Sequence, residues 1–317
     1  MRRAAPRRVA GSVVFDEGRR VAKHPPPFNP RQQQPGARAL DRAALALRMG
    51  HLAEAERLAG EVLKASRTDA AAVALLAQAL IAQNRGIEAV SPLEKVVRRG
   101  NDAGLETLLG AALGSAGRGE EAIGQLRRTA ARRPPFAPAI QELAGQLAKA
   151  GRVDEAIAAV ESGVALLPEN IDLQLDLARL YLLRNRRAKA RGILSMAREA
   201  APGRPETFTA LGRVLLLEGE FDAAEDAFRH AVALRPDDAL ARADLATCLL
   251  EMGKRDAGEA NLRQAFRGRP EMLGRATYAL VQSSHGRFFF RQSEFAKFLQ
   301  DEPLKPGIDA GRNHARD

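Results

Sequence analysis

Apolar residues recur along the chain at the spacing of amphipathic helices, in pairs of segments separated by a short turn. Residues 205–238 show the pattern most clearly. The apolar stripe of the first segment recurs at i, i+3, i+4 and i+7 and consists of Phe208, Leu211, Gly212 and Leu215. Gly219 then marks a turn, the second segment places Ala224 and Phe228 on one face, and Pro236 ends it. The pattern predicts two helices packed as a hairpin, with small residues where they approach each other.

The hairpin pattern repeats with a period of 34 residues. The closing proline recurs as Pro168, Pro202, Pro236 and Pro270. A leucine of the first helix recurs as Leu143, Leu177, Leu211 and Leu245. A small residue of the second helix recurs as Ala122, Ala156, Ala190, Ala224 and Gly258. Several columns in phase at a fixed period indicate a repeat protein, in which each hairpin buries its apolar face against its neighbours.

These columns resemble the tetratricopeptide repeat family. Its signature places Leu and then Gly or Ala at positions 7 and 8 of each copy, Ala at position 20 and Pro at position 32, which here are Leu211, Gly212, Ala224 and Pro236. The resemblance implies an all-α, right-handed superhelical solenoid of about seven 34-residue helix-turn-helix repeats plus a C-terminal capping helix pair. The predicted copies are 36–69, 70–102, 103–136, 137–170, 171–204, 205–238 and 239–272. The first two match the signature more weakly than the others.

The segments outside the repeats differ in composition. Residues 1–35 are rich in Pro and Arg and carry a net charge of +6, whereas 36–272 carry only +2 of the total of +10. We expect a flexible basic arm at 1–35 and a flexible tail at 301–317. Residues 273–300 are rich in Phe and are expected to cap the apolar end of the solenoid. The alternative for this segment is an exposed aromatic docking patch.

The sequence lacks the motifs of catalysis and of cofactor or metal binding. Its one cysteine, Cys248, stands beside the core position Leu249 and fits a small buried filler. One cysteine excludes an internal disulfide and a zinc site built on several thiolates. No phosphate-binding glycine loop is present. We therefore predict no catalytic, cofactor-binding or metal-binding residues, no small-molecule substrate and no enzyme activity.

The family resemblance also implies where a partner binds. In the family, positions 2, 5, 9, 12 and 13 of each copy line a concave groove that takes an extended peptide or a helix. Carried over to this chain, the predicted groove residues are Gln141, Lys149, Asp172, Leu175, Arg179, Leu183, Thr209, Arg213, Leu217 and Thr247. Arg179 and Arg213 both occupy position 9, so they would stand in line and suit a carboxylate. We expect a partner segment with acidic and aliphatic residues, the alternative being a solvated arginine pair.

The sequence favours a non-enzymatic scaffold or adaptor that binds a protein partner. One alternative is a nucleic-acid-associated helical-repeat protein that uses the basic arm at 1–35. Another is an assembly factor of a bacterial envelope machine for pilus, secretion or polysaccharide assembly, with the arm against an anionic membrane surface. The Arg- and Ala-rich composition is of a bacterial type. Since no secretion signal or membrane-spanning stretch is evident, we expect a cytoplasmic protein, with peripheral membrane association as the alternative.

One copy is expected to be softer than the others. Residues 103–136 contain six glycines, at 104, 110, 114, 117, 119 and 124. Glycine inside a helix costs up to about 1 kcal/mol relative to alanine. We therefore predict a soft joint between the N-terminal copies and a firmer C-terminal stack.

Overall fold

A computed structural model of the protein describes residues 35–285 and 292–300. Its helices are α1 (Pro35–Arg48), α2 (Leu52–Ala65), α3 (Ala70–Ala82), α4 (Gly86–Val97), α5 (Ala103–Ser115), α6 (Gly119–Ala130), α7 (Ala137–Lys149), α8 (Val153–Leu166), α9 (Ile171–Leu183), α10 (Arg187–Ala200), α11 (Pro205–Glu218), α12 (Phe221–Leu234), α13 (Ala239–Glu251), α14 (Arg255–Phe266), α15 (Leu273–Gln282) and α16 (Gln292–Gln300). A short 3₁₀ turn, Pro270–Met272, precedes α15. The described residues contain no strand, as the all-α prediction required.

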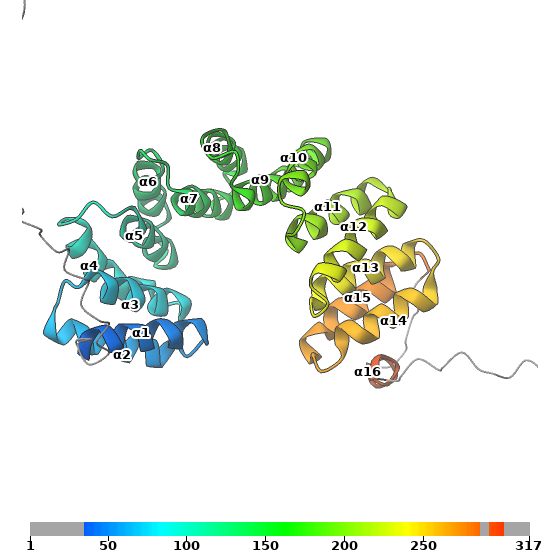
Figure 1. Ribbon diagram of the computed structural model, residues 1–317, viewed down its shortest axis with the longest axis horizontal. Coiled ribbons are helices and arrows are strands. Elements are labelled where there is room, and N and C mark those ends of the chain that lie inside the picture. Colours follow the sequence, from blue (N-terminus) through cyan, green and yellow to red (C-terminus); the bar gives the residue numbers. More distant parts are fainter. Residues whose placement is uncertain (1–34, 286–291, 301–317) are drawn as a thin grey trace, which may run out of the picture.

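The helices form a solenoid of hairpins, which confirms the predicted fold class. From α1 to α15 each helix packs on the next along the chain, and α16 packs on α14. Each first helix also contacts the first helix of the following hairpin, from α1 on α3 to α13 on α15. Figure 1 shows the hairpins following an arch, with α5, α7 and α9 on its inner side and α6, α8 and α10 on its outer side. The first helices therefore form the concave face.

The tight turn inside each hairpin depends on one position of the repeat. Position 15 adopts a left-handed conformation, with φ between 54° and 80°, in seven successive hairpins: Gly50, Asn84, Gly117, Gly151, Asn185, Gly219 and Gly253. Glycine tolerates this conformation without strain, and asparagine tolerates it better than most other residues. The turn reverses the chain directly after each first helix, so that the second helix returns along it.

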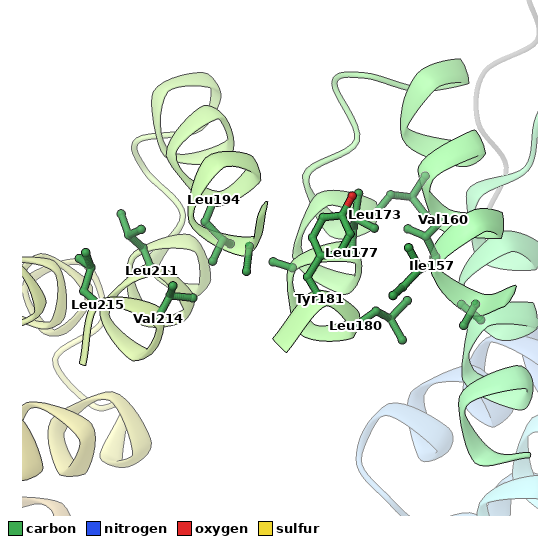
Figure 2. Close-up of a cluster of buried hydrophobic side chains, with 14 of the residues drawn as sticks. Ile157, Val160, Leu173, Leu177, Leu180, Tyr181, Leu194, Leu211, Val214 and Leu215 are labelled. Carbon is green, nitrogen blue, oxygen red and sulfur yellow. The ribbon is translucent and has the colours of Figure 1, made fainter. Parts of the chain in front are cut away.

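The core depends on a large residue of each second helix that faces a small residue of its own first helix. The large residues, at position 24, are fully buried: Leu126, Val160, Leu194, Phe228 and Leu262. Where Phe228 stands, position 8 is Gly212, and a Cβ atom added there would lie 2.8 Å from the phenylalanine ring. The copies join into a continuous apolar cluster from α6 to α13, part of which Figure 2 shows. Size matching within each hairpin thus sets how closely its two helices approach.

The C-terminal helices cap the stack, as the sequence predicted. Phe295 and Leu299 of α16 are buried in one cluster with Leu262 of α14 and Leu280 of α15. Arg263 lies over the Phe298 ring, 4.2 Å from its centroid, and donates from Nε to the Phe298 carbonyl oxygen. Phe288, Phe289 and Phe290 lie outside the described residues. The last hairpin therefore does not present a bare apolar face.

Arginine–carboxylate pairs form both at the starts of second helices and between neighbouring hairpins. Arg118, which precedes α6, donates from Nε and Nη2 to Glu121 at 2.8 and 2.6 Å, and Arg85 and Arg152 bind the glutamate three residues later in the same way. Other pairs cross between hairpins, such as Arg127–Glu155 at 2.5 Å and Arg204–Asp172 at 2.7 Å. Exposed pairs contribute little stability singly, but they neutralise many of the acids and arginines of the repeats.

A buried carboxylate makes the stability of the C-terminal stack depend on pH. Burial would raise the pKa of Glu225, but hydrogen bonds from Lys254 and Arg229 outweigh it and hold the pKa below its ordinary value of 4.5. The two ion pairs measure 2.5 Å each. A lowered pKa in the folded state adds stability above pH 4.5, and this stability is lost as the pH falls below that value.

We expect the urea midpoint of unfolding to stay constant between about pH 7 and 5, and to decrease once the pH is below the ordinary pKa of a carboxyl group. Glu225→Gln should lower the free energy of unfolding near neutral pH by on the order of 1 kcal/mol, and with it the urea midpoint, and should flatten the decline in acid. Glu199→Gln, at an exposed position, is the matched control and should behave as the unmodified protein does. An acid decline in Glu225→Gln as steep as in the control would show that the pKa of Glu225 does not contribute.

Candidate functional site

The predicted groove residues all lie on the first helices α7, α9, α11 and α13. Six of them are exposed: Lys149, Asp172, Arg179, Leu183, Arg213 and Leu217. The other four are half-buried: Gln141, Leu175, Thr209 and Thr247. The hydroxyls of Thr209 and Thr247 donate to carbonyl oxygens one turn back in their own helices, so part of their hydrogen-bonding capacity is already used.

The first polar cluster of the concave face is centred on Asp176. Gln141 of α7 donates from Nε2 to Asp176 Oδ2 at 2.7 Å, and Arg179 donates from Nη2 to Asp176 Oδ1 at 2.8 Å. The Arg179 side chain is still 70% exposed. This aspartate therefore joins α7 to α9 and leaves most of the Arg179 guanidinium facing solvent.

The second polar cluster is centred on Asp244, whose side chain is only 9% exposed. Arg213 of α11 donates from Nε to Asp244 Oδ2 at 2.6 Å. Arg275 of α15 donates to the other carboxylate oxygen. The two arginines at position 9 thus bind different carboxylates of the protein, which the sequence prediction did not include. Asp176 and Asp244 occupy position 6, which was not among the predicted groove positions.

Two large aliphatic side chains stand out from the concave face between polar neighbours. Leu183 is 62% exposed and Leu217 is 52% exposed, at position 13 of adjacent copies. Lys149 and Glu251 occupy the same position in the copies before and after them. Leu182 and Leu216, one position earlier, are half-buried beside them. We call Leu182, Leu183, Leu216 and Leu217 the leucine ridge.

An apolar pocket of about 550 Å³ lies farther toward the N-terminus, between α3 and α5. Ala74 of α3 and Leu108 of α5 line it, together with Phe136 and Pro138 at the start of α7. We call it the α3–α5 pocket. The groove prediction named none of these residues. The available signal was the run of small residues at groove positions 2 and 5, namely Ala71, Ala74 and Gly104, followed by a lone aromatic residue.

Cys248 lies in the core rather than in a site. Its side chain is fully buried, and its thiol donates to the Phe221 carbonyl oxygen at 3.2 Å. Burial, with a smaller effect of the Glu225 charge, raises the pKa of the thiol to about 11. A buried thiol with a raised pKa is a poor nucleophile. Within 35–285 and 292–300, no cluster of His, Cys, Asp and Glu has the arrangement of a metal site.

Some predictions concern parts of the chain that the structure does not describe. The basic arm, and with it the nucleic-acid and membrane alternatives, falls in residues 1–34, and the tail falls in 301–317. Among the helices that are described, none has the length and hydrophobicity needed to cross a bilayer.

Comparison with solved structures found matches of low sequence identity. The crystal structure of the APC/C hetero-tetramer Cut9–Hcn1 aligns with 83% of this chain at 17% identity and a TM-score of 0.49, and the chain spans 55% of that longer protein. A structure of MamA MSR-1 aligns with 51% of this chain and 93% of its own length at 25% identity and a TM-score of 0.41. MamA 41-end from Desulfovibrio magneticus RS-1 aligns at 17% identity and a TM-score of 0.47, over 54% of this chain and 97% of its own. No curated protein matches the sequence.

Models of the tetratricopeptide repeat match the central and C-terminal hairpins. One matches residues 107–171. A second matches residues 147–214 and 215–271. Together the matches run without a gap from α5 to the 3₁₀ turn, which is more than half of the chain, and their helices show the signature columns in the core. The chain belongs to the tetratricopeptide repeat family.

Proposed function

We propose that the protein is a non-enzymatic scaffold that binds an extended segment or a helix of a partner protein along its concave face. Membership of the tetratricopeptide repeat family supports a protein-interaction scaffold in general. The concave face as the binding surface, and the chemistry of the partner, are inferences from the geometry of this chain.

The leucine ridge is the observation that carries the proposal. Exposed leucines at the same position of adjacent copies favour contact with an apolar partner group. The α3–α5 pocket offers a second apolar contact on the same face. A partner with aliphatic side chains at both places would cross the polar cluster around Asp176, whereas the cluster around Asp244 lies beyond the ridge, on α11, α13 and α15. This arrangement suits a chain segment better than a small ligand.

The arginines give the partner its polar character. Arg179 retains exposed nitrogen atoms beyond its contact with Asp176, so it can bind an acidic side chain of the partner. The Arg213 side chain is less exposed, at 45%, and its Nε lies closer to its carboxylate partner, 2.6 Å from Asp244 Oδ2. Because carboxylates already accompany both arginines, we assign the larger share of the binding energy to the leucines. The same carboxylates argue against a nucleic acid in this groove, since they would repel phosphates.

The ridge is tested by comparing two double variants of the full chain in quantitative affinity capture from the source cells. Leu183→Asp with Leu217→Asp is expected to lower the yield of specific partners at least about tenfold, because charged groups would replace the central apolar contacts. Leu166→Asp with Leu234→Asp changes two exposed leucines on second helices, which are 44% and 45% exposed and so somewhat less exposed than the ridge leucines, and this variant should capture the same partners as the unmodified protein.

Equal capture by the ridge variant and the control would overturn the proposal. The acidic character of the partner is tested in the same assay with Arg179→Gln and Arg213→Gln together. Capture that is unchanged in this variant would remove the acidic residue from the description of the partner and leave the apolar contact in place.

A further inference from the structure

A crevice of about 460 Å³ opens between the second helices α10 and α12, away from the groove-lining positions. Its walls are formed by Arg191, Ser195 and Arg198 of α10 and by Asp226 and His230 of α12. Its floor is formed by α11. We propose that this crevice is a second protein-binding site, which accepts a partner segment in which a large apolar side chain stands next to an acidic one.

The crevice is open because one position of the repeat holds an unusually short side chain. Position 25 is Arg127 in α6, Glu161 in α8, Ser195 in α10, Arg229 in α12 and Arg263 in α14. In the earlier hairpins this side chain reaches toward the next second helix: Arg127 pairs with Glu155 at 2.5 Å, and Glu161 lies 3.9 Å from Lys189. Ser195 is too short to make such a contact. The space that an arginine or glutamate fills elsewhere therefore remains available between α10 and α12.

The floor of the crevice is apolar and aromatic. Phe208, Leu211 and Leu215 of α11 line it. Figure 2 shows Leu211 and Leu215 on the side of α11 away from Tyr181, which is the side that faces the next hairpin. The His230 ring stacks on Phe208 with ring centroids 5.4 Å apart and planes 12° apart. Phe208, Leu211 and Leu215 are 9%, 3% and 5% exposed, so a large apolar side chain of a ligand would contact their outer edges and the exposed His230 ring.

The two arginines at the crevice differ in how closely carboxylates of the protein already bind them. Arg191 is held by Glu218 at 3.1 Å and by Glu220 at 2.5 Å. Arg198 has a carboxylate only at the outer limit of an ion pair, 3.9 Å away, on its sequence neighbour Glu199. Its guanidinium is therefore the group best able to bind an acidic side chain of the ligand. Asp226, on the opposite wall, can accept a hydrogen bond from a backbone N–H of the same ligand.

The site is tested by amide NMR of the full-length protein with three capped dipeptides as probes. Acetyl-Glu-Phe-amide is expected to shift the amide signals of Ser195, Ala223 and Ala227. Acetyl-Gln-Phe-amide, which has the same shape without the charge, should bind about fivefold more weakly, the usual size of an exposed charged contact. Acetyl-Glu-Ala-amide should cause no shift at these positions, because it lacks the large apolar group.

Three variants assign the effect to the crevice. Ser195→Glu introduces the residue that stands at the same position in α8, so it should fold, close the crevice and abolish the shifts. Arg198→Gln should remove the preference for the Glu probe over the Gln probe. Lys189→Gln, on the same helix and outside the crevice, is the control and should change neither. Thermal unfolding of each variant checks that the stack is intact.

The proposal is overturned if the Glu-Phe probe leaves the three amides unshifted, if the Glu and Gln probes bind equally, or if Ser195→Glu still responds. Shifts confined to the concave face would also overturn it, while leaving the groove proposal standing. Conversely, the Leu183→Asp and Leu217→Asp variant should keep the response of the crevice. The two binding proposals can therefore fail separately.

Discussion

Replacing Phe228 by alanine is expected to lower the free energy of unfolding of the C-terminal stack by about 3–5 kcal/mol. Phe228 is fully buried and belongs to the cluster that runs from α6 to α13. Its ring lies against Gly212 of the preceding helix. The substitution removes the ring and leaves a cavity that the helix hairpin fills only in part, so the transfer and cavity costs add.

A pair of milder substitutions tests the size matching itself. Gly212→Ala would place a Cβ atom 2.8 Å from the Phe228 ring, which forces a shift and should cost about 1–3 kcal/mol. Phe228→Leu makes room for that methyl group. The double variant reproduces Ala178 and Leu194 of the preceding copy. We expect Gly212→Ala to cost little once Phe228→Leu is present.

Chemical denaturation of the unmodified protein, the two single variants and the double variant measures this coupling. The unfolding curve is analysed for the transition that includes α11 and α12, because repeat stacks do not always unfold in one step. Additive costs for the two substitutions would contradict the size-matching argument. A cost of less than about 1 kcal/mol for Phe228→Ala would show that the hairpin collapses around the missing ring.

Most of the fold could be predicted from the sequence because each core position recurs in several copies, so that the residue type it requires can be recognised. The column Ala122, Ala156, Ala190, Ala224 and Gly258 is small because each residue is buried where two helices cross. The turn at position 15 of each copy could be predicted only in part, since Asn84 and Asn185 replace glycine in the left-handed conformation. The weakest matches, 36–69 and 70–102, still form helix pairs, α1 with α2 and α3 with α4. Copy 70–102 keeps small and apolar signature residues such as Ala77, Ala89 and Leu93, and in copy 36–69 the amphipathic pattern of α1 and α2 suffices.

The surface could be predicted far less completely. Helical periodicity places Arg179 and Arg213 on one line, but it does not show which acids they meet. Asp244 lies 31 residues from both Arg213 and Arg275, and this contact follows from how three hairpins stack. The crevice beside Ser195 results from a side chain that is short where its counterparts are long. Such a feature becomes visible in a sequence only once the copies are aligned and the facing helix is known.

One division of the apolar core falls at the copy that was predicted to be soft, and another falls within α13, where Leu249 and Leu250 belong to different clusters. One cluster extends from α3 to α6 and ends at Ala122, and the next begins at Ile123 and Leu126 of the same helix. Gly110 and Gly114 of α5 are buried at this division. We predict that the two clusters open independently of each other, since stability in a repeat protein comes from each copy and its nearest neighbours.

Labelling of Cys248 by a disulfide reagent is expected to be at least about a hundredfold slower in the folded protein than in the unfolded chain. The pKa of this thiol rises from 9.0 to about 11 on folding, mainly by burial. A rise of two units in the pKa makes the thiolate about a hundredfold scarcer at neutral pH. Its full burial adds to the protection, because the reagent needs contact with the sulfur. The labelling rate therefore reports how often the C-terminal stack opens.

Two truncations of equal kind, one in each cluster, turn this rate into a test of the joint. Phe228→Ala lies in the cluster of Cys248 and should speed labelling by a factor of 100 or more, on the order expected from about 3 kcal/mol. Leu93→Ala, also fully buried, lies in the α3–α6 cluster and should leave the rate unchanged. If Leu93→Ala accelerated labelling as strongly as Phe228→Ala, the stack would open as one unit and the joint at 103–136 would not exist. An acceleration by Phe228→Ala alone would show that the C-terminal stack opens while the N-terminal hairpins stay folded.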